Sequence, residues 1–278
     1  MDDKKAVKMS DQDFCNRSIE IVKIARDNGV SLRILGAMAV YIHAGRTPEH
    51  LEKYLALERL GPGRPMFTDL DVMAYSAHRK KLSEVFEKHL RFQPDHYVNR
   101  LFGSRRNIFR DPNGLFDVDV FFDSLTFSHE VKFWDALGGD RLELDFPTIS
   151  LEDIVLEKLQ IHKINRKDLV DLFMLFWTHG ISEGHADEKV DAKYIARVLS
   201  DDWGFEYDAK GNLGKLKEFS VSLVQTGKAT KDQADEVNTK VERLMAAIDS
   251  EPKSKAWRKR AKKGISKPWF EEVEEVER

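Results

Sequence analysis

The stretch FTDLDVMAYS, Phe67 to Ser76, combines a strand-like apolar pattern with two aspartates that are one residue apart. Alternate residues of a strand point to the same face, so Asp69 and Asp71 would hold like charges within roughly 7 Å of each other. The chain contains three Asp-x-Asp triplets, about as many as a random arrangement of its aspartates would produce. The setting of the triplet therefore decides between a solvated strand edge and a site for a divalent cation.

Two further strand-like segments supply that setting. Upstream, a short apolar run ends at Gly36, and a helix-like segment follows at 37–44. Downstream, LFDVDVFFD at 115–123 alternates regularly and carries Asp117 and Asp119 on one face. If these strands are neighbours, three carboxylates meet over one end of a sheet. Oxygen ligands at this density suit Mg²⁺.

The order of the elements predicts an α+β fold. Helix-like segments at 10–28 and 78–90 flank the strands, and two more short strands are expected at 97–102 and 106–109. Strands that are separated by reversing turns, with helices between only some of them, indicate a mixed β-sheet with flanking helices. This α+β region is expected to span residues 1–148.

A helical region is expected to follow at 149–278. Its apolar residues recur at helical spacing, which predicts four helices, at 150–162, 167–179, 192–199 and 231–248. No internal repeat is visible in the sequence.

The composition favours a globular protein with a highly charged surface, since 41% of the 278 residues are hydrophobic and 33% are charged. The net charge of −3 excludes a global electrostatic attraction to nucleic acid. The single cysteine, Cys15, excludes an internal disulfide and is expected to be a buried structural thiol. Because no secretory signal or membrane-spanning run is visible, we expect a cytoplasmic protein without membrane contact.

Two further features concern ligands. The histidines His43, His78, His129 and His162 lack the Cys/His spacing of zinc sites, so no zinc site is expected. Near the carboxyl end, Lys253–Lys267 carries eight basic residues, a tryptophan and no acid, a composition that can contact RNA or DNA backbone. The acidic sequence that follows offers an equally physical partner for the same charges.

Four stretches, taken in order, resemble the nucleotidyltransferase superfamily of the DNA polymerase β type. They are LRILGAMAVYIHAG, FTDLDVMAY, FDVDVFF and LEDIVLEKLQIHKINRKDLVDLFML, at 32–45, 67–75, 116–122 and 151–175. The chain looks most like the small bacterial and archaeal nucleotidyltransferases, which include the abortive-infection type IV toxins of toxin–antitoxin pairs. The resemblance covers a little over half of the chain.

The resemblance implies an enzyme that uses one or two Mg²⁺ ions and a nucleoside triphosphate such as ATP. It would transfer a nucleoside monophosphate to a hydroxyl of a protein, an RNA or a small molecule and release pyrophosphate. Asp69 and Asp71 would bind the metal, and Asp119 would be the third carboxylate and the general base. Asp117 shares a strand face with Asp119 and remains the alternative.

The resemblance also implies the nucleotide contacts. Gly36 would open the loop beside the triphosphate, and Lys158 would offer a cation to phosphate. Ala37 stands where the superfamily commonly has Ser or Gly, which leaves its backbone N–H as the phosphate donor. Three residues match a Lys-Asp-x-x-Asp stretch of the family: Lys167, Asp168 and Asp171. Because Ala37 lacks a hydroxyl, a non-catalytic nucleotide- or partner-binding module of the same fold is the alternative, and nucleic-acid binding through the basic stretch is a third interpretation.

Overall fold

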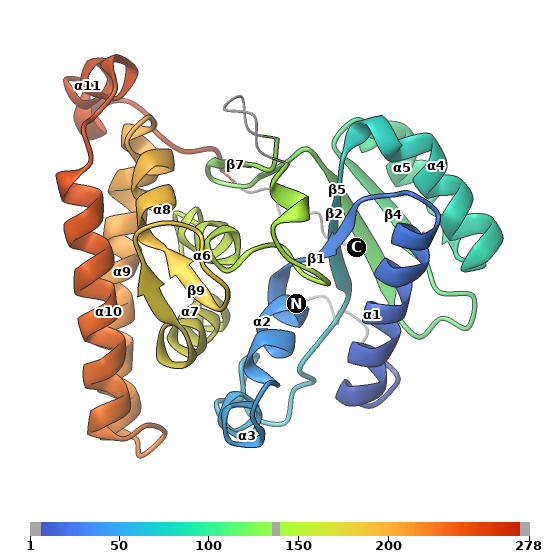
Figure 1. Ribbon diagram of the computed structural model, residues 1–278, viewed down its shortest axis with the longest axis horizontal. Coiled ribbons are helices and arrows are strands. Elements are labelled where there is room, and N and C mark those ends of the chain that lie inside the picture. Colours follow the sequence, from blue (N-terminus) through green and yellow to red (C-terminus); the bar gives the residue numbers. More distant parts are fainter. Residues whose placement is uncertain (1–6, 135–139, 273–278) are drawn as a thin grey trace.

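The computed structural model describes residues 7–134 and 140–272, and it contains a five-stranded mixed sheet with flanking helices (Figure 1). The strand order is β1-β2-β5-β4-β3. The strands are β1 Leu32–Ile34, β2 Leu70–Ala74, β3 Gln93–Pro94, β4 Arg106–Arg110 and β5 Asp117–Phe122. β2 and β5 are parallel and the other neighbouring pairs are antiparallel, so the predicted α+β class with a mixed sheet is confirmed.

Five α-helices accompany this sheet. They are α1 Asp11–Asp27, α2 Gly36–Ala44, α3 Pro48–Ala56, α4 Arg79–Glu84 and α5 His96–Phe102. A 3₁₀ turn, η1 Ser76–His78, precedes α4, and a π turn, η2 Val85–His89, continues it. α1 begins where the sequence predicts, because the Ser10 side chain accepts a hydrogen bond from the Asp13 N–H at 3.1 Å.

The strand expected at 97–102 is wrong, since these residues belong to α5. Asp95 caps this helix, and its carboxylate accepts hydrogen bonds from the N–H groups of Tyr97 and Val98 at 3.1 and 3.0 Å. A cap of this kind satisfies N–H groups that the first helical turn leaves without partners. It outweighs the strand preference of the short aromatic and branched run that follows Asp95.

An aromatic core fixes the approach to β2. Phe67 lies just before the strand and is buried, with its ring centroid 5.4 Å from Phe14 and 5.3 Å from Tyr41. Phe14 also contacts Phe116, which precedes β5, at 4.9 Å. Cys15 is buried as expected, and burial raises the pKa of its thiol to about 11. The packing thus holds the segments that enter β2 and β5 side by side.

The second half of the described chain is mainly helical. Its α-helices are α6 Leu151–Leu159, α7 Arg166–Thr178, α8 Ala192–Leu199, α9 Trp203–Gln225, α10 Lys231–Ser250 and α11 Lys255–Ala261. Its 3₁₀ turns are η3 Arg141–Glu143 and η4 Gly264–Ser266. The short strands outside the main sheet are β6 Ser124–Thr126, β7 Glu130–Lys132, β8 Gly180–Ser182 and β9 Lys189–Asp191. All four predicted helices are present, whereas α9, α11 and the strand pairs β6–β7 and β8–β9 were not expected.

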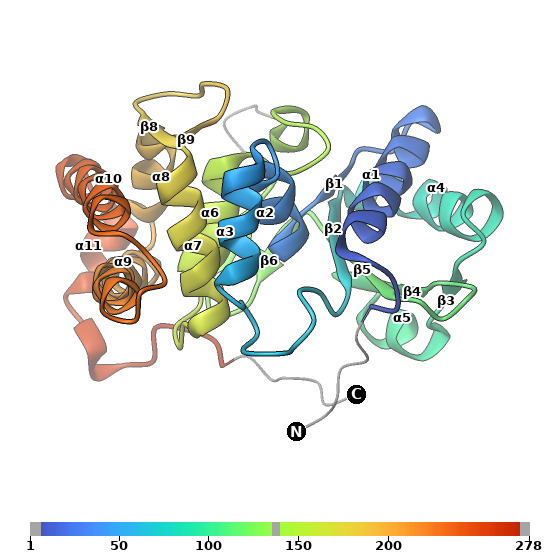
Figure 2. The ribbon, with the colours of Figure 1, turned by 90° about the horizontal axis from the view of Figure 1, so that it is seen from below.

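α2 and α3 lie between the sheet and helices α6 and α7, whereas α1 and α4 lie on the far side of the sheet (Figure 2). At the expected boundary, residue 148, the chain rejoins the sheet edge. The Ile34 N–H donates to the Pro147 carbonyl at 3.0 Å, and the Ile149 N–H donates to the Ile34 carbonyl at 2.9 Å. The two regions are therefore in contact there, and their division into domains 1–148 and 149–278 stays a prediction. None of the described helices has the length and apolar character needed to cross a membrane.

Candidate functional site

Three aspartates converge at one end of the β2–β5 pair. Asp71 and Asp119 are register partners on these parallel strands, and Asp69 immediately precedes β2. One carboxylate oxygen from each residue lies within 4.8 Å of the other two. Asp119 is buried, while Asp69 and Asp71 are partly exposed. This group of oxygen donors can hold a metal ion.

The same geometry helps to decide whether Asp117 or Asp119 is the third carboxylate of the site. Within the described chain, the group of converging carboxylates includes Asp119 and does not include Asp117. Asp117 is the first residue of β5 and pairs in register with Arg110, at the far end of the strand from Phe122. The convergence of the carboxylate oxygens therefore favours Asp119 over Asp117.

Arg106 on β4 is a site residue that the sequence analysis did not connect to the acids. Its guanidinium donates a hydrogen bond to Asp119 Oδ2 and lies 5.4 Å from the centroid of the Phe121 ring. The Arg106 side chain is 29% exposed, whereas that of Asp119 is 3% exposed. Arg106 thus balances the charge of a buried carboxylate from a position that still reaches solvent.

Gly36 is the first residue of α2 and lies directly beside the acids. The preceding Leu35 N–H donates to the Asp71 carbonyl at 3.1 Å, and Gly36 has a φ of +69°. A Cβ at this position would lie 3.0 Å from Asp71 Oδ2. Both the backbone conformation and the close approach to Asp71 therefore require glycine.

The Gly36 N–H donates to Glu157 Oε2 at 3.0 Å. Glu157 belongs to α6, so its carboxylate crosses from the helical half to the N-terminus of α2, where an anion is stabilised. The resemblance predicted that Gly36 opens a loop beside the triphosphate, and the structure has a protein carboxylate at the Gly36 N–H. Ala37, the neighbouring predicted donor, is packed against the core.

Lys158 is buried in a network of acids. Its Nζ lies 3.1 Å from Glu157, 3.2 Å from Asp171 and 3.6 Å from Asp168. Burial alone would lower the pKa of Lys158, but the carboxylates of Glu157, Asp171 and Asp168 raise it above its ordinary value. The lysine is therefore a charged centre that protein groups surround.

Asp171 joins the same network from the interior of α7. It accepts hydrogen bonds from the Tyr54 hydroxyl at 2.6 Å and from Arg59 Nε at 2.8 Å. Burial pushes the pKa of Asp171 upward, but Arg59 and Lys158 outweigh this effect and hold it below the ordinary value. Lys167 lies in the first turn of the helix, where Asn165 provides the cap.

The predicted residues from the two halves thus form one continuous set. Asp71 contacts the Gly36 region, Gly36 is bonded to Glu157, and Glu157 pairs with Lys158. Glu157 of α6, Asp171 of α7 and Arg59, which follows α3, complete this set. Sequence spacing does not reveal that they lie together. The bond between Gly36 and Glu157, for example, joins positions 121 residues apart.

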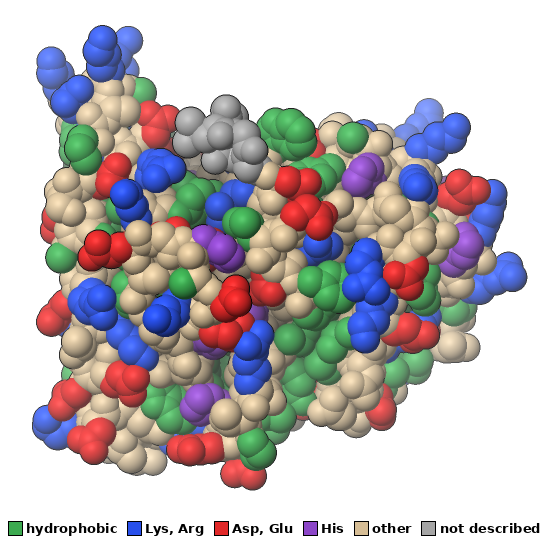
Figure 3. Space-filling model, in the orientation of Figure 1, with side chains coloured by type: hydrophobic (Ala, Val, Ile, Leu, Met, Phe, Trp, Pro, Cys, Tyr) green, Lys and Arg blue, Asp and Glu red, His purple; other side chains and the backbone are tan. Residues whose placement is uncertain are grey.

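The basic stretch comprises α11 and the residues on either side of it, and it lies in the helical half, away from β2 and β5 (Figure 1). Figure 3 shows Lys and Arg side chains gathered over α11. Lys253 pairs with Glu206 at 2.7 Å, and Arg260 donates to the Gly264 carbonyl at 2.8 Å. The other six basic side chains are exposed: Lys255, Arg258, Lys259, Lys262, Lys263 and Lys267. Nucleic-acid contact stays a prediction, and residues 273–278 of the acidic sequence lie outside the described residues.

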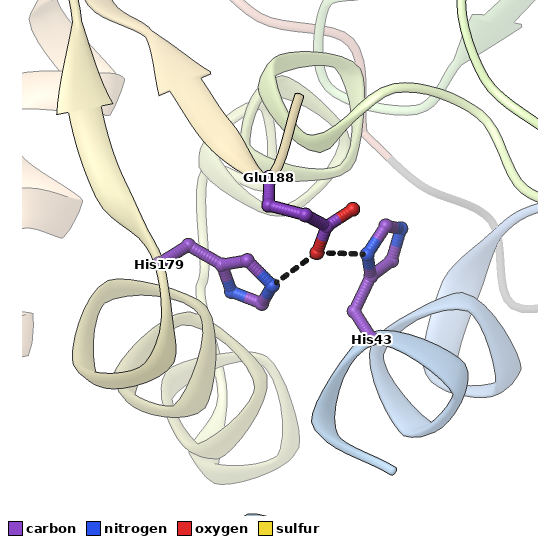
Figure 4. Close-up of side chains that lie close together, drawn as sticks. All are labelled: His43, His179 and Glu188. Carbon is purple, nitrogen blue, oxygen red and sulfur yellow. Dashed lines mark ion pairs between the residues drawn. The ribbon is translucent and has the colours of Figure 1, made fainter. Parts of the chain in front are cut away.

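Two other features were not expected. A cleft of about 690 Å³ lies beside α9, with walls that include Trp203, Tyr207 and Trp257, and it contains none of the predicted site residues. A second potential metal-binding group consists of His43, His179 and Glu188 (Figure 4). The expectation that the chain has no zinc site was based on the spacing of Cys and His along the sequence. Such spacing cannot reveal ligands that come from separate elements.

Comparison of the chain with protein-family models, curated proteins and solved structures found no match. The chemistry of the site is therefore inferred from its residues.

Proposed function

We propose that the protein is a Mg²⁺-dependent nucleotidyltransferase. It transfers a nucleoside monophosphate from a nucleoside triphosphate to a hydroxyl acceptor and releases pyrophosphate. The observation that carries this proposal is the convergence of Asp69, Asp71 and Asp119 beside Gly36 at the start of α2. The order of these residues along the chain matches the resemblance to the DNA polymerase β type superfamily, which supports the same reaction class.

The donor set suits the ion. Three carboxylates supply hard oxygen ligands, and Mg²⁺ commonly completes its shell with water and substrate phosphates. When bound, Mg²⁺ would offset the negative charge of the transferring phosphate. Gly36 supports the fit, because a Cβ there would lie 3.0 Å from Asp71 Oδ2 and would crowd this carboxylate.

The protein residues have distinct roles in this proposal. Asp69 and Asp71 hold the ion, and Asp119 accepts the proton of the attacking hydroxyl. Arg106 fixes the Asp119 carboxylate through its hydrogen bond to Oδ2. The Gly36 N–H would bind phosphate once Glu157 releases it, because an incoming anion competes with that carboxylate for the same donor.

One observation favours a second candidate, a nucleotide- or partner-binding module without turnover. The Gly36 N–H and the Lys158 ammonium both contact Glu157, so two of the predicted nucleotide-binding residues already have a protein carboxylate as their partner. In this alternative, the three aspartates bind a complex of metal and nucleotide, and no nucleoside monophosphate is transferred.

Labelled nucleoside triphosphates, Mg²⁺ and three acceptor pools (the protein itself, RNA and a cell extract) provide the test. We expect label transfer that depends on Mg²⁺ and falls by about 100-fold or more in Asp69→Asn/Asp71→Asn, because an ion of this kind supplies several kcal/mol to the transition state. Undiminished transfer by this variant would refute the assignment. Calorimetric nucleotide binding without transfer in any pool would favour the binding module.

A further inference from the structure

A second cluster of potential ligands lies where α2 meets the helical half. His43 is on α2, His179 follows α7, and Glu188 precedes β9. Both histidines are buried, with exposed fractions of 2% and 4%. Figure 4 shows both rings directed at the Glu188 carboxylate from opposite sides. His43 Nδ1 lies 3.6 Å and His179 Nε2 lies 3.2 Å from Glu188 Oε2.

The contacts of His43 Nε2, on the side of the ring away from Glu188, determine which ring nitrogen carries the proton. His43 Nε2 is 2.9 Å from Thr148 Oγ1. The Thr148 hydroxyl donates its only hydrogen to Asp145 Oδ2 at 3.1 Å, so it must accept from His43. The proton of the neutral ring is therefore on Nε2, and Nδ1 presents a lone pair. Among the described residues, this buried Nδ1 has no hydrogen-bond partner.

His179 is oriented in the same manner. Its Nδ1 is 2.7 Å from Thr178 Oγ1 and 3.3 Å from the Leu175 carbonyl. The Thr178 hydroxyl donates to the Met174 carbonyl at 2.7 Å, so both neighbours of Nδ1 can only accept. The neutral ring thus carries its proton on Nδ1, and the lone pair of Nε2 faces Glu188.

Glu188 completes a set of three acceptors. Its Oε1 is held by Arg46 at 2.5 Å, while its buried Oε2 has no hydrogen-bond partner among the described residues. Glu188 also has a φ of +56°, a region that a residue with a side chain adopts at a cost. When both rings are neutral, three lone pairs face one another and repel, and a cation between them removes this repulsion.

The distances fit a small divalent ion. Zinc bonds of about 2.0–2.2 Å to imidazole nitrogen and carboxylate oxygen place tetrahedral ligand atoms about 3.3–3.6 Å apart. The two measured separations, 3.2 and 3.6 Å, match this spacing. Hydrogen bonds from the distal ring nitrogens to protein oxygens are also the usual support of metal-binding histidines.

We propose that His43, His179 and Glu188 form a binding site for Zn²⁺ or another first-row divalent transition ion. Two imidazoles and one carboxylate leave one position for water. A cleft of about 290 Å³, whose walls include Arg46, Asp145 and Glu188, provides a path from solvent. The ion would link α2, the helix that Gly36 opens, to the residue that follows α7 and to the residue that precedes β9. The nitrogen ligands distinguish this site from the all-oxygen site of the aspartates.

Calorimetric titration of chelator-treated full-length protein with ZnSO₄ tests the proposal, with Mg²⁺ in excess to occupy the oxygen site. We expect one Zn²⁺ per chain. His179→Gln and Glu188→Gln should each weaken binding by about 100-fold or more, because each removes a direct ligand. His89→Gln removes an exposed histidine of η2 and should bind like the wild type. Asp69→Asn/Asp71→Asn should also keep its Zn²⁺ affinity, which separates this result from the proposed transferase activity.

Absence of stoichiometric Zn²⁺ uptake by the wild type would overturn the proposal, and so would equal uptake by the folded Glu188→Gln variant. Far-UV circular dichroism establishes that each variant is folded. If the variants do not fold, the visible absorption spectrum of Co²⁺ bound to the wild type tests the proposal. Intense visible bands of four-coordinate Co²⁺ are expected, whereas the weak bands of six-coordinate Co²⁺ or no bands would contradict the site.

Discussion

At the scale of single residues, the structure surrounds the buried carboxylate of Asp171 with positive charges. Asp171 has no exposed surface, and it contacts Lys158, Arg59 and the Tyr54 hydroxyl. Burying a carboxylate alone is costly, and removal of one member of a buried pair leaves the other without compensation. The sequence predicted Lys158, Asp168 and Asp171 as nucleotide contacts. In the structure, Lys158 contacts the two aspartates instead.

Asp171→Asn should lower the free energy of unfolding by about 3–5 kcal/mol, because Lys158 and Arg59 then face each other with less negative charge between them. Urea denaturation measures this change. Glu20→Gln is the control, since the Glu20 side chain is 56% exposed and its pair with Arg17 should contribute about 1 kcal/mol at most. Equal losses in the two variants would contradict the account of the network.

The same carboxylate gives a pH prediction. The pKa of Asp171 is held below its ordinary value of 3.8 in the folded protein. Its stabilising contribution is therefore complete above that ordinary value and is lost as pH falls through the lower, folded pKa. Urea unfolding at a series of acidic pH values should show a steeper decline for the wild type than for Asp171→Asn. Parallel curves would show that this group does not contribute to acid unfolding.

Gly36 can be tested against a glycine of the same conformation. Gly36 and Gly227 both have a φ of +69°, but an added Cβ meets Asp71 Oδ2 at 3.0 Å at the first position and no described atom within 4 Å at the second. Alanine at either site should cost about 1–2 kcal/mol of stability. Only Gly36→Ala should also weaken Mg²⁺ binding, measured by calorimetry. Equal metal affinity in both variants would contradict the close contact with Asp71.

At the scale of elements, the sequence was informative where a pattern is local. The apolar alternation of β5 and the glycine that separates β1 from α2 are visible in short windows. α9 was missed because three glycines and many polar residues interrupt its apolar positions. The segment 97–102 was assigned to a strand because its aromatic and branched residues favour one, whereas the Asp95 cap favours α5.

The grouping of Asp119 with Asp69 and Asp71 leads to a prediction about the two aspartates of β5. Asp119 faces Asp71 directly, and Asp117 lies two residues away at the end of β5. Asp119→Asn should reduce nucleotide transfer by about 100-fold or more, because the proton acceptor is lost. Asp117→Asn should retain most of the activity in the same labelled assay. The reverse ranking would show that Asp117 is the third carboxylate.

At the scale of the whole molecule, the two halves meet at α2. Glu157 of α6 bonds to the first residue of this helix, and His43 near its other end faces His179 and Glu188. The C-terminal segment also returns to the first half, where the Glu271 N–H donates to the Ser128 carbonyl at 3.0 Å. Such contacts join residues far apart in the chain, so no local sequence pattern predicts them.

The contact between the halves gives a prediction for nucleotide affinity. Glu157→Gln removes the negative charge that competes with phosphate for the Gly36 N–H, so nucleoside triphosphates should bind more tightly. Asp168→Asn is the control, because Asp168 lies 3.6 Å from Lys158 and, among its described contacts, has none with Gly36. Calorimetry with a triphosphate and Mg²⁺ compares the two. Weaker binding by Glu157→Gln would show that its carboxylate assists the nucleotide rather than competing with it.

The central claim, that the three aspartates bind the metal of a bound nucleotide, is tested most directly by anomalous X-ray diffraction. Crystals would be soaked with Mn²⁺ and a triphosphate analogue whose α–β bridge cannot be cleaved. We expect an anomalous peak in contact with carboxylate oxygens of Asp69, Asp71 and Asp119, with the triphosphate beside Gly36. A nucleotide bound elsewhere, or no peak at these carboxylates, would contradict the account.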